Sequence, residues 1–177
     1  MRATPAEIFM RFTSVSVAIA LVALSVSTSL YGQRADDQID ARSMALLQQG
    51  RQAQAAGNLT AAIDSLETAL AVDPRNREAF VTLGDIARAR DLPGKAIRYY
   101  RHALTLDPND TVAMRGEGEA LVAKGAMDKA NEVLANVRAI CNGGACPDGD
   151  RLAAVIAKGP PPTATAANET PAPETAQ

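Results

Sequence analysis

The chain repeats itself with a period of 34 residues. One copy begins at Gly50 with GRQAQAAGNLTAAIDSLETALAVDPRN, the next begins at Gly84 with GDIARARDLPGKAIRYYRHALTLDPND, and a weaker third copy begins at Gly118. A fixed period of this length predicts a stacked repeat architecture, because a single unit cannot bury its apolar face alone. The nine positions that agree between the first two copies are Gly50/Gly84, Ala53/Ala87, Ala55/Ala89, Ala62/Ala96, Ile63/Ile97, Ala69/Ala103, Leu70/Leu104, Asp73/Asp107 and Pro74/Pro108.

The composition favours helices that meet through small side chains. Apolar residues make up 47% of the chain, aromatic residues only 3%, and tryptophan is absent. Glycine and alanine recur one or two helical turns apart, so each helix offers a narrow seam where a neighbouring backbone approaches closely. The Asp-Pro pairs at 73–74 and 107–108 end helices, because proline disfavours helical geometry in the residue before it. The expected helices lie near 38–56, 59–72, 76–90, 93–106, 111–124, 127–140 and 148–158.

These units resemble the tetratricopeptide repeat family, whose 34-residue unit is a helix–turn–helix with small residues at fixed positions and a closing proline. The resemblance covers about residues 41–140. The family's large, leucine-like and glycine positions of the first helix are filled by Leu46, Gln49 and Gly50, by Phe80, Leu83 and Gly84, and by Met114, Glu117 and Gly118. The small positions of the second helix are Ala62 and Ala69, Ala96 and Ala103, and Ala130 and Val137, and the closing prolines are Pro74 and Pro108. Gln49, Glu117, Val137 and the missing third proline depart from the pattern.

The resemblance implies an all-α fold, a right-handed α-solenoid of three helix–turn–helix units with a C-terminal capping helix. A stack of repeats leaves an apolar face open at its end, which a terminal cap covers. Leu152, Val155 and Ile156 give the last helix such a face; the alternative is that this helix binds a partner. The expected segments are a linker and helix start at 33–42, units at 43–76, 77–110 and 111–142, and a cysteine loop with the capping helix at 143–158.

Both ends of the chain differ from the repeats. Residues 1–32 place basic residues before a short apolar stretch and then small polar residues, which is the order of a secretory signal peptide. An uncleaved N-terminal anchor and an unrelated amphipathic or buried helix are the alternatives, and Met10 is an alternative start. The body of the protein is then expected to be exported to the periplasm. Residues 159–177 are rich in Pro, Ala and Thr and are expected to be a disordered tail.

The sequence holds no recognisable catalytic, cofactor or metal motif. His102 is the only histidine, and no motif supplies the partner that a catalytic histidine requires, so a surface or packing role is expected. Phosphate-binding and zinc-protease motifs are absent. A net charge of −2 lacks the basic field that nucleic-acid binders use. We therefore expect a non-enzymatic protein with no cofactor, no metal and no nucleic-acid partner.

The resemblance further implies a concave groove lined by the first helix of each unit. Its residues mix apolar side chains with charges of both signs, which suits an extended peptide or a helix held by a few anchors and by charge register. A merely solvated face is the alternative. Where one family subtype clamps a C-terminal carboxylate, only Arg51 is suitable here, so no such clamp is expected. The implied groove residues are Met44, Leu47, Arg51, Gln54, Val81, Asp85, Arg88, Val112, Arg115, Glu119 and Val122.

The only two cysteines, Cys141 and Cys146, stand five positions apart around two glycines. Export favours a disulfide between them. Metal binding would need further ligands that the sequence does not supply, and thiol–disulfide catalysts usually carry a C-x-x-C motif. We expect a structural disulfide that pins the capping helix to the third unit, with redox activity, free thiols or metal binding as alternatives.

Together these features predict an exported, non-enzymatic interaction module that holds a peptide or helix of another envelope protein in its groove. One alternative is a membrane-anchored envelope assembly factor, which would contact the membrane only through an uncleaved segment 1–32. Another is a redox-active or metal-binding protein that uses Cys141 and Cys146.

Overall fold

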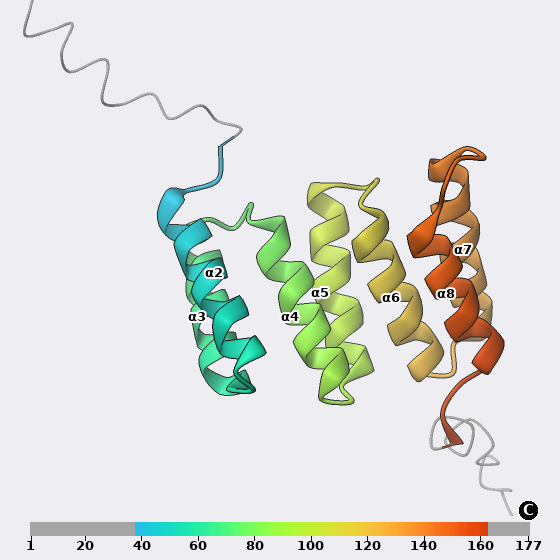
Figure 1. Cartoon of the computed structure of the whole chain (residues 1–177), viewed down its shortest axis with the longest axis horizontal. Coiled ribbons are helices and arrows are strands. Elements are labelled where there is room, and N and C mark those ends of the chain that lie inside the picture. The colour runs from blue at the N-terminus through green and yellow to red at the C-terminus, as the bar shows by residue number, and fades with distance from the viewer. Residues whose placement is uncertain (1–37, 163–177) are drawn as a thin grey trace, which may run out of the picture. The chain divides into compact units, whose positions relative to one another are not determined.

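The computed structural model describes residues 38–162 (Figure 1). The chain divides into two units, residues 1–38 and 39–177, and all the helices described here belong to the second. The expected signal or anchor segment and residues 163–177 of the expected tail lie outside the described residues. Within 38–162 the regular structure is entirely helical, which confirms the all-α prediction. The helices are α2 (Ala41–Ala55), α3 (Leu59–Val72), α4 (Arg77–Ala89), α5 (Pro93–Leu106), α6 (Thr111–Ala123), α7 (Met127–Cys141) and α8 (Pro147–Lys158).

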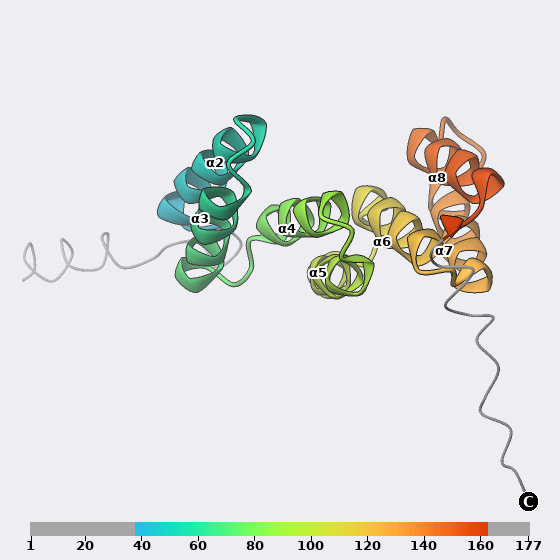
Figure 2. The same cartoon turned by 90° about the horizontal axis from the view of Figure 1, so that it is seen from below.

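The helices pack as consecutive pairs, α2 with α3, α4 with α5 and α6 with α7. The first helices α2, α4 and α6 contact one another in chain order, and α8 continues this row by packing on α6. Figure 2 shows α4, α6 and α8 on one side, with the second helices α5 and α7 on the other. This is the helical solenoid that the repeats predicted.

Local sequence signals set where the helices begin and end. Asn58, Asn76 and Asp110 are N-cap residues whose side chains accept hydrogen bonds from backbone N–H groups of the first turns, which supplies acceptors to otherwise unpaired donors. Asp73 and Asp107 adopt extended conformations directly before proline, as the steric effect of the proline ring requires. The observed helices therefore begin and end within three residues of the predicted bounds.

Close helix contacts form where a glycine faces a large side chain. A Cβ at Gly50 would lie 2.7 Å from Cγ of Leu66, and one at Gly84 would lie 2.7 Å from the ring of Tyr100. The same ring also lies against Gly116 of the next unit. Tyr100 is completely buried and thus packs between α4 and α6, which explains why both helices have glycine there.

The third unit departs from the first two in how it meets the helix that follows it. Of the two helices in the preceding unit, α4 and α6 each pack more on the second one, whereas α8 packs more on the first helix, α6, than on α7. Leu152 of α8 is completely buried and lies against Gly118, where a Cβ would be 2.6 Å from Cδ2 of the leucine. The last helix therefore covers part of the inner side of α6, in addition to the end of the stack.

Glu117, which departs from the repeat pattern, forms an ion pair with Arg101. This residue stands at the leucine-like position of the third unit, and it is buried. Its Oε1 lies 2.7 Å from Nε of Arg101 in α5. The ion pair satisfies the carboxylate and allows a charge at a position that is otherwise apolar.

Candidate functional site

The predicted groove residues lie on the first helices, but not all of them reach the surface. Leu47 has 0% of its surface exposed and Val122 only 2%. Leu47 belongs to the core cluster that the first pair shares with α4, and Val122 to the cluster between the second and third pairs. These two residues are part of the core, so their expected role as groove lining is corrected. Met44, Val81 and Val112 remain exposed or partly exposed.

Arg51 pairs with a neighbour in the next unit. Its Nη2 lies 2.7 Å from Oε2 of Glu78 in α4, and both side chains are about half exposed. Glu78 was missed as a groove residue, although it stands 34 positions after Met44 and 34 before Val112. Extending the 34-residue register from Met44 is enough to predict Glu78 as a groove residue.

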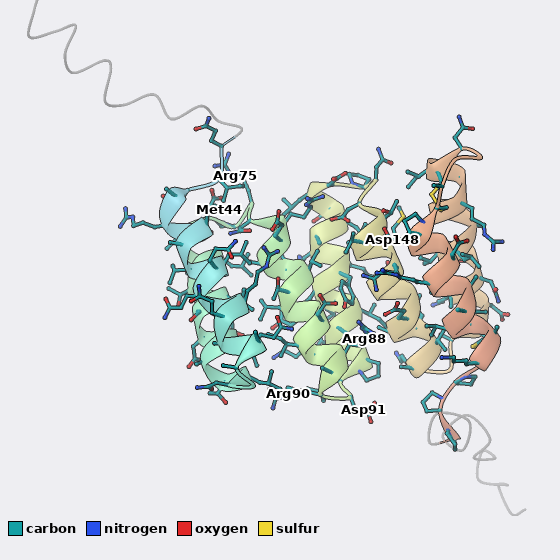
Figure 3. The ribbon with its side chains drawn as sticks, viewed as in Figure 1. Met44, Arg75, Arg88, Arg90, Asp91 and Asp148 are labelled. Carbon is teal, nitrogen blue, oxygen red and sulfur yellow. A yellow bond between two sulfur atoms is a disulfide. The ribbon has the colours of Figure 1, made fainter. Side chains whose placement is uncertain are left out.

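The charges of the second and third units form one continuous network. Glu119 pairs with two arginines: its Oε2 lies 2.6 Å from Nη1 of Arg88 in an ion pair, and its Oε1 accepts a hydrogen bond from Nη1 of Arg115 at 3.0 Å. Arg115 also donates from Nε to Oδ1 of Asp148 at 2.9 Å. Met44, Arg88 and Asp148 come from α2, α4 and α8 (Figure 3). The network therefore ties α4 and α6 to α8.

Each end of this network has a neutral donor. The hydroxyl of Thr111 donates to Oδ2 of Asp148 at 2.8 Å. The hydroxyl of Tyr100 donates to Oδ1 of Asp85 at 2.7 Å, and Asp85 lies 3.6 Å from Nη2 of Arg88. Burial raises the pKa of Tyr100 above its ordinary value, and the negative charge of Asp85 adds to this effect. The phenol is thus a permanent hydrogen-bond donor at neutral pH.

Burial, the largest single effect, lowers the pKa values of Arg88 and Arg115. Tyr100, followed by Glu119 and Asp85, nevertheless raises the pKa of Arg88 above its ordinary value, and Glu119 and Asp148 raise that of Arg115. Arg88 keeps one unsatisfied group: its Nε is buried without a hydrogen-bond partner within residues 38–162. All three arginines of the predicted groove are therefore already paired with carboxylates, and only Arg88 has a buried donor left over. A ligand that relied on these arginines would have to displace their partners.

The apolar part of the groove remains accessible. Met44, Val81 and Val112 come from three consecutive first helices, and Val112 is 42% exposed. Met44 and Glu78 also border a depression of about 280 Å³ at the start of α4. Gln54 at the end of α2 is partly exposed. The surface that a partner can reach thus consists of apolar side chains surrounded by paired charges.

Cys141 and Cys146 form a disulfide with a Cα–Cα distance of 5.6 Å. Cys141 is the last residue of α7, and Cys146 directly precedes α8. Gly149 fits against this bridge, because a Cβ there would lie 2.8 Å from Sγ of Cys146. The disulfide holds the start of α8 beside the end of α7.

Other chemical features of residues 38–162 are few. His102 is exposed and stacks on Phe80 with the ring centroids 5.3 Å apart. Nowhere in this range do three His, Cys, Asp or Glu side chains gather closely enough to hold a metal ion. Among the described helices none has both the length and the apolar character that a membrane span requires.

Comparisons with known proteins agree with this geometry. Residues 47–111 match a tetratricopeptide repeat family model, whereas a search of the curated proteins found no match. An O-GlcNAc transferase from Thermobaculum terrenum is 27% identical with a TM-score of 0.54, over 58% of this chain and 20% of the transferase. The chain thus spans only a fifth of the length of that enzyme.

Two solved repeat domains are matched over nearly their whole length. The Sgt2 TPR domain from Aspergillus fumigatus has a TM-score of 0.61 and 24% identity, over 82% of this chain and 95% of that domain. The TPR2B domain of yeast Sti1, solved as a complex with pHsp70, has a TM-score of 0.61 and 16% identity, over 67% and 98%. At these identities the likeness shows the fold. The 34-residue period, the glycine contacts and the family match together identify residues 47–111 as tetratricopeptide repeats.

Proposed function

We propose that this protein is an exported, non-enzymatic interaction module that holds a segment of another envelope protein against α2, α4 and the start of α6. The observation that carries the proposal is the set Met44, Val81 and Val112, which leaves exposed or partly exposed apolar side chains on the first helices of three consecutive units. An extended or helical segment with apolar residues at matching intervals would bury them.

The paired arginines change the expected mode of binding. Arg51, Arg88 and Arg115 hold Glu78, Glu119 and Asp148, so the partner is recognised mainly through apolar anchors. Arg88 supplies a polar contact through the exposed part of its guanidinium, whereas its unpaired Nε is buried and is out of reach of a partner. A peptide carbonyl is the acceptor that fits it with the least loss of the existing ion pairs.

Two neighbours in fold support binding of a polypeptide. The yeast Sti1 domain was solved with pHsp70, and the first TPR of Spaghetti (RPAP3) was solved with an HSP90 peptide. Export is supported by the order of residues in 1–32 and by the disulfide, because disulfides persist in oxidising compartments. The envelope partner and the periplasmic location are part of the proposal. Edman sequencing of the protein from membrane and soluble fractions distinguishes a cleaved signal from a retained anchor.

Site-specific photo-crosslinking tests the groove. A photoreactive amino acid replaces Met44 or Val112 in the groove, or Val72 as a control of similar exposure at the end of α3. We expect Met44 and Val112 to crosslink to the same segment of one envelope protein, identified by mass spectrometry, and Val72 not to do so. Val112→Asp should weaken capture more than Val72→Asp does. Crosslinks to unrelated segments, or equal capture by the two aspartate variants, would contradict the proposal.

A further inference from the structure

The outward face of α5 differs in charge from the corresponding faces of α3 and α7. Four register positions of each second helix are exposed or partly exposed and lie outside the core clusters. In α3 two of the four are acidic; in α5 three are cations and the fourth is histidine; in α7 one cation is balanced by one acid. The three sets are Ala61, Asp64, Glu67 and Thr68; Lys95, Arg98, Arg101 and His102; and Lys129, Glu132, Ala135 and Asn136.

The cationic face of α5 continues into a depression beside the start of α7. The depression has a volume of about 260 Å³, and it is bordered by Arg101, Lys124 and Lys129 without any carboxylate among its lining residues. Its apolar lining residues are Ile97, Leu121 and Ala126. A depression with a cationic rim and apolar walls fits a ligand that presents acidic groups beside an apolar side chain.

These cations are available to a partner. Within residues 38–162, neither Arg98 nor Lys124 nor Lys129 has a carboxylate within ion-pair distance. Arg101 holds Glu117, yet its side chain remains 58% exposed. This situation is the opposite of that on the inner side, where each groove arginine is paired. We call Lys95, Arg98, Arg101, Lys124 and Lys129 the outer basic surface.

We infer that the outer basic surface is a second docking site, which binds an acidic polypeptide segment carrying an apolar residue among its Asp and Glu side chains. α5 has 14 residues and is therefore about 21 Å long. A single helix or extended segment of a partner can follow it and place an apolar side chain in the depression beside α7. The long-range attraction of opposite charges would then accelerate encounter and set the register.

A narrow polypeptide fits this surface better than an anionic lipid bilayer does. A bilayer would meet the whole outer side of the molecule, including Asp64 and Glu67 on the neighbouring α3. Those carboxylates would be repelled by anionic headgroups and would offset part of the attraction of about 1 kcal/mol per Lys or Arg. A segment that runs along α5 and ends in the depression at Lys129, in the first turn of α7, avoids the acids of α3 and does not follow α7 to Glu132. The protein would then hold one partner on its inner side and a second on its outer side.

Fluorescence anisotropy with a defined probe tests the inference. The probe is a fluorescein-labelled peptide of repeated Glu-Glu-Leu, and the matched control peptide is repeated Gln-Gln-Leu. Two variants, Arg98→Gln/Lys124→Gln/Lys129→Gln and the corresponding triple change to Glu, remove or reverse charge without touching the Arg101–Glu117 pair. Arg42→Glu/Arg151→Glu/Lys158→Glu is the control variant, because it reverses three exposed cations elsewhere. Thermal unfolding confirms that each variant is folded.

We expect the acidic peptide, and not the glutamine peptide, to bind the wild type and the control variant. The neutralised variant should bind at least about tenfold more weakly, and raising the ionic strength from about 0.01 M to about 1 M should abolish binding, since the Debye length falls from about 30 Å to about 3 Å. Equal binding of both peptides, or an affinity of the neutralised variant equal to that of the wild type, overturns the inference. Sedimentation with phosphatidylglycerol vesicles without peptide binding overturns it in favour of a membrane surface.

Discussion

Arg88 of α4 and Glu119 of α6 form an ion pair in which Nη1 and Oε2 lie 2.6 Å apart. The other carboxylate oxygen of Glu119 accepts from Arg115, which in turn holds Asp148 of α8. One carboxylate therefore connects the second unit, the third unit and the cap. Because of its position, the charged residues of the second and third units in the predicted groove pair with one another and with α8.

Replacing Glu119 tests this role. Glu119→Gln leaves Arg88 and Arg115 around a neutral amide. Hydrogen bonds to charged groups contribute about 1.5–3 kcal/mol each, and the partial exposure of Arg88 reduces its share. We therefore expect the free energy of unfolding to fall by about 2 kcal/mol. Urea denaturation measures the change. Glu132→Gln, an exposed control on α7, should change it by less than about 0.5 kcal/mol. Equal effects would show that the Glu119 network contributes nothing to stability.

A methyl group at Gly118 should disturb the docking of α8. A Cβ there would lie 2.6 Å from Cδ2 of Leu152, so Gly118→Ala is expected to cost about 1–3 kcal/mol despite the better helix propensity of alanine. Gly94→Ala is the matched control, because no atom lies within 4 Å of a Cβ built at that helical position. Hydrogen exchange should show faster exchange in α8 for Gly118→Ala only. Unchanged exchange in α8 would mean that Leu152 readily finds another position.

Asp73 makes stability depend on acid pH. Hydrogen bonding from the side chain of Arg75, followed by that from the backbone N–H of Asp40, lowers its pKa from 3.8 to about 2. Because the folded-state pKa is depressed, this contribution to stability is complete above about pH 4 and is lost as the pH falls towards 2. The difference in urea midpoint between the wild type and Asp73→Asn should be constant above pH 4 and should shrink below it. A difference that stays constant down to pH 2 would indicate a packing effect.

The disulfide is expected to stabilise the protein without taking part in its function. A loop this short contributes about 2 kcal/mol in the loop-entropy estimate, so Cys141→Ser/Cys146→Ser should melt at a lower temperature by calorimetry and should no longer respond to reductant. Crosslinking from Val112 should persist below the melting temperature. Loss of crosslinking at unchanged stability would instead assign the cysteines a functional role.

The buried Glu117 should tolerate the leucine that the second unit has at this register. Glu117→Leu removes a buried charge, and its partner Arg101 is largely exposed, so water can solvate the arginine that remains. Replacement of buried ion pairs by apolar residues is often neutral or stabilising, and we expect a gain of about 1 kcal/mol in urea denaturation. A loss larger than about 1 kcal/mol would show that the ion pair itself orders the contact between α5 and α6.

The helical framework could be predicted from the sequence because its signals are local. The Asp-Pro pairs and the capping side chains of Asn76 and Asp110 act within a few residues of the helix ends, so their effect does not depend on the rest of the fold. The 34-residue period then predicts that the units stack in chain order. The burial of Tyr100 and the partial exposure of Tyr99 likewise follow from adjacent positions on one helix.

The candidate site was harder to predict because it depends on how neighbouring helices lie against each other. Arg88 and Glu119 are 31 positions apart, so the 34-residue register alone does not bring them together. Val122 is buried although Arg88 at the corresponding place is not, since α8 packs more extensively on α6 than α6 does on α4. The role of Glu78, in contrast, could have been found by extending the register from Met44.

The ring of Tyr100 lies between Gly84 and Gly116, whereas at the corresponding register of the preceding unit stand Leu66 and Thr82. A copy of the first unit in place of the second would leave empty space beside Gly116, and a copy of the second in place of the first would press an aromatic ring against a threonine. The units are thus no longer interchangeable. A unit can therefore be added, removed or exchanged during evolution only if the large side chain and the residue that it contacts in the next unit change together.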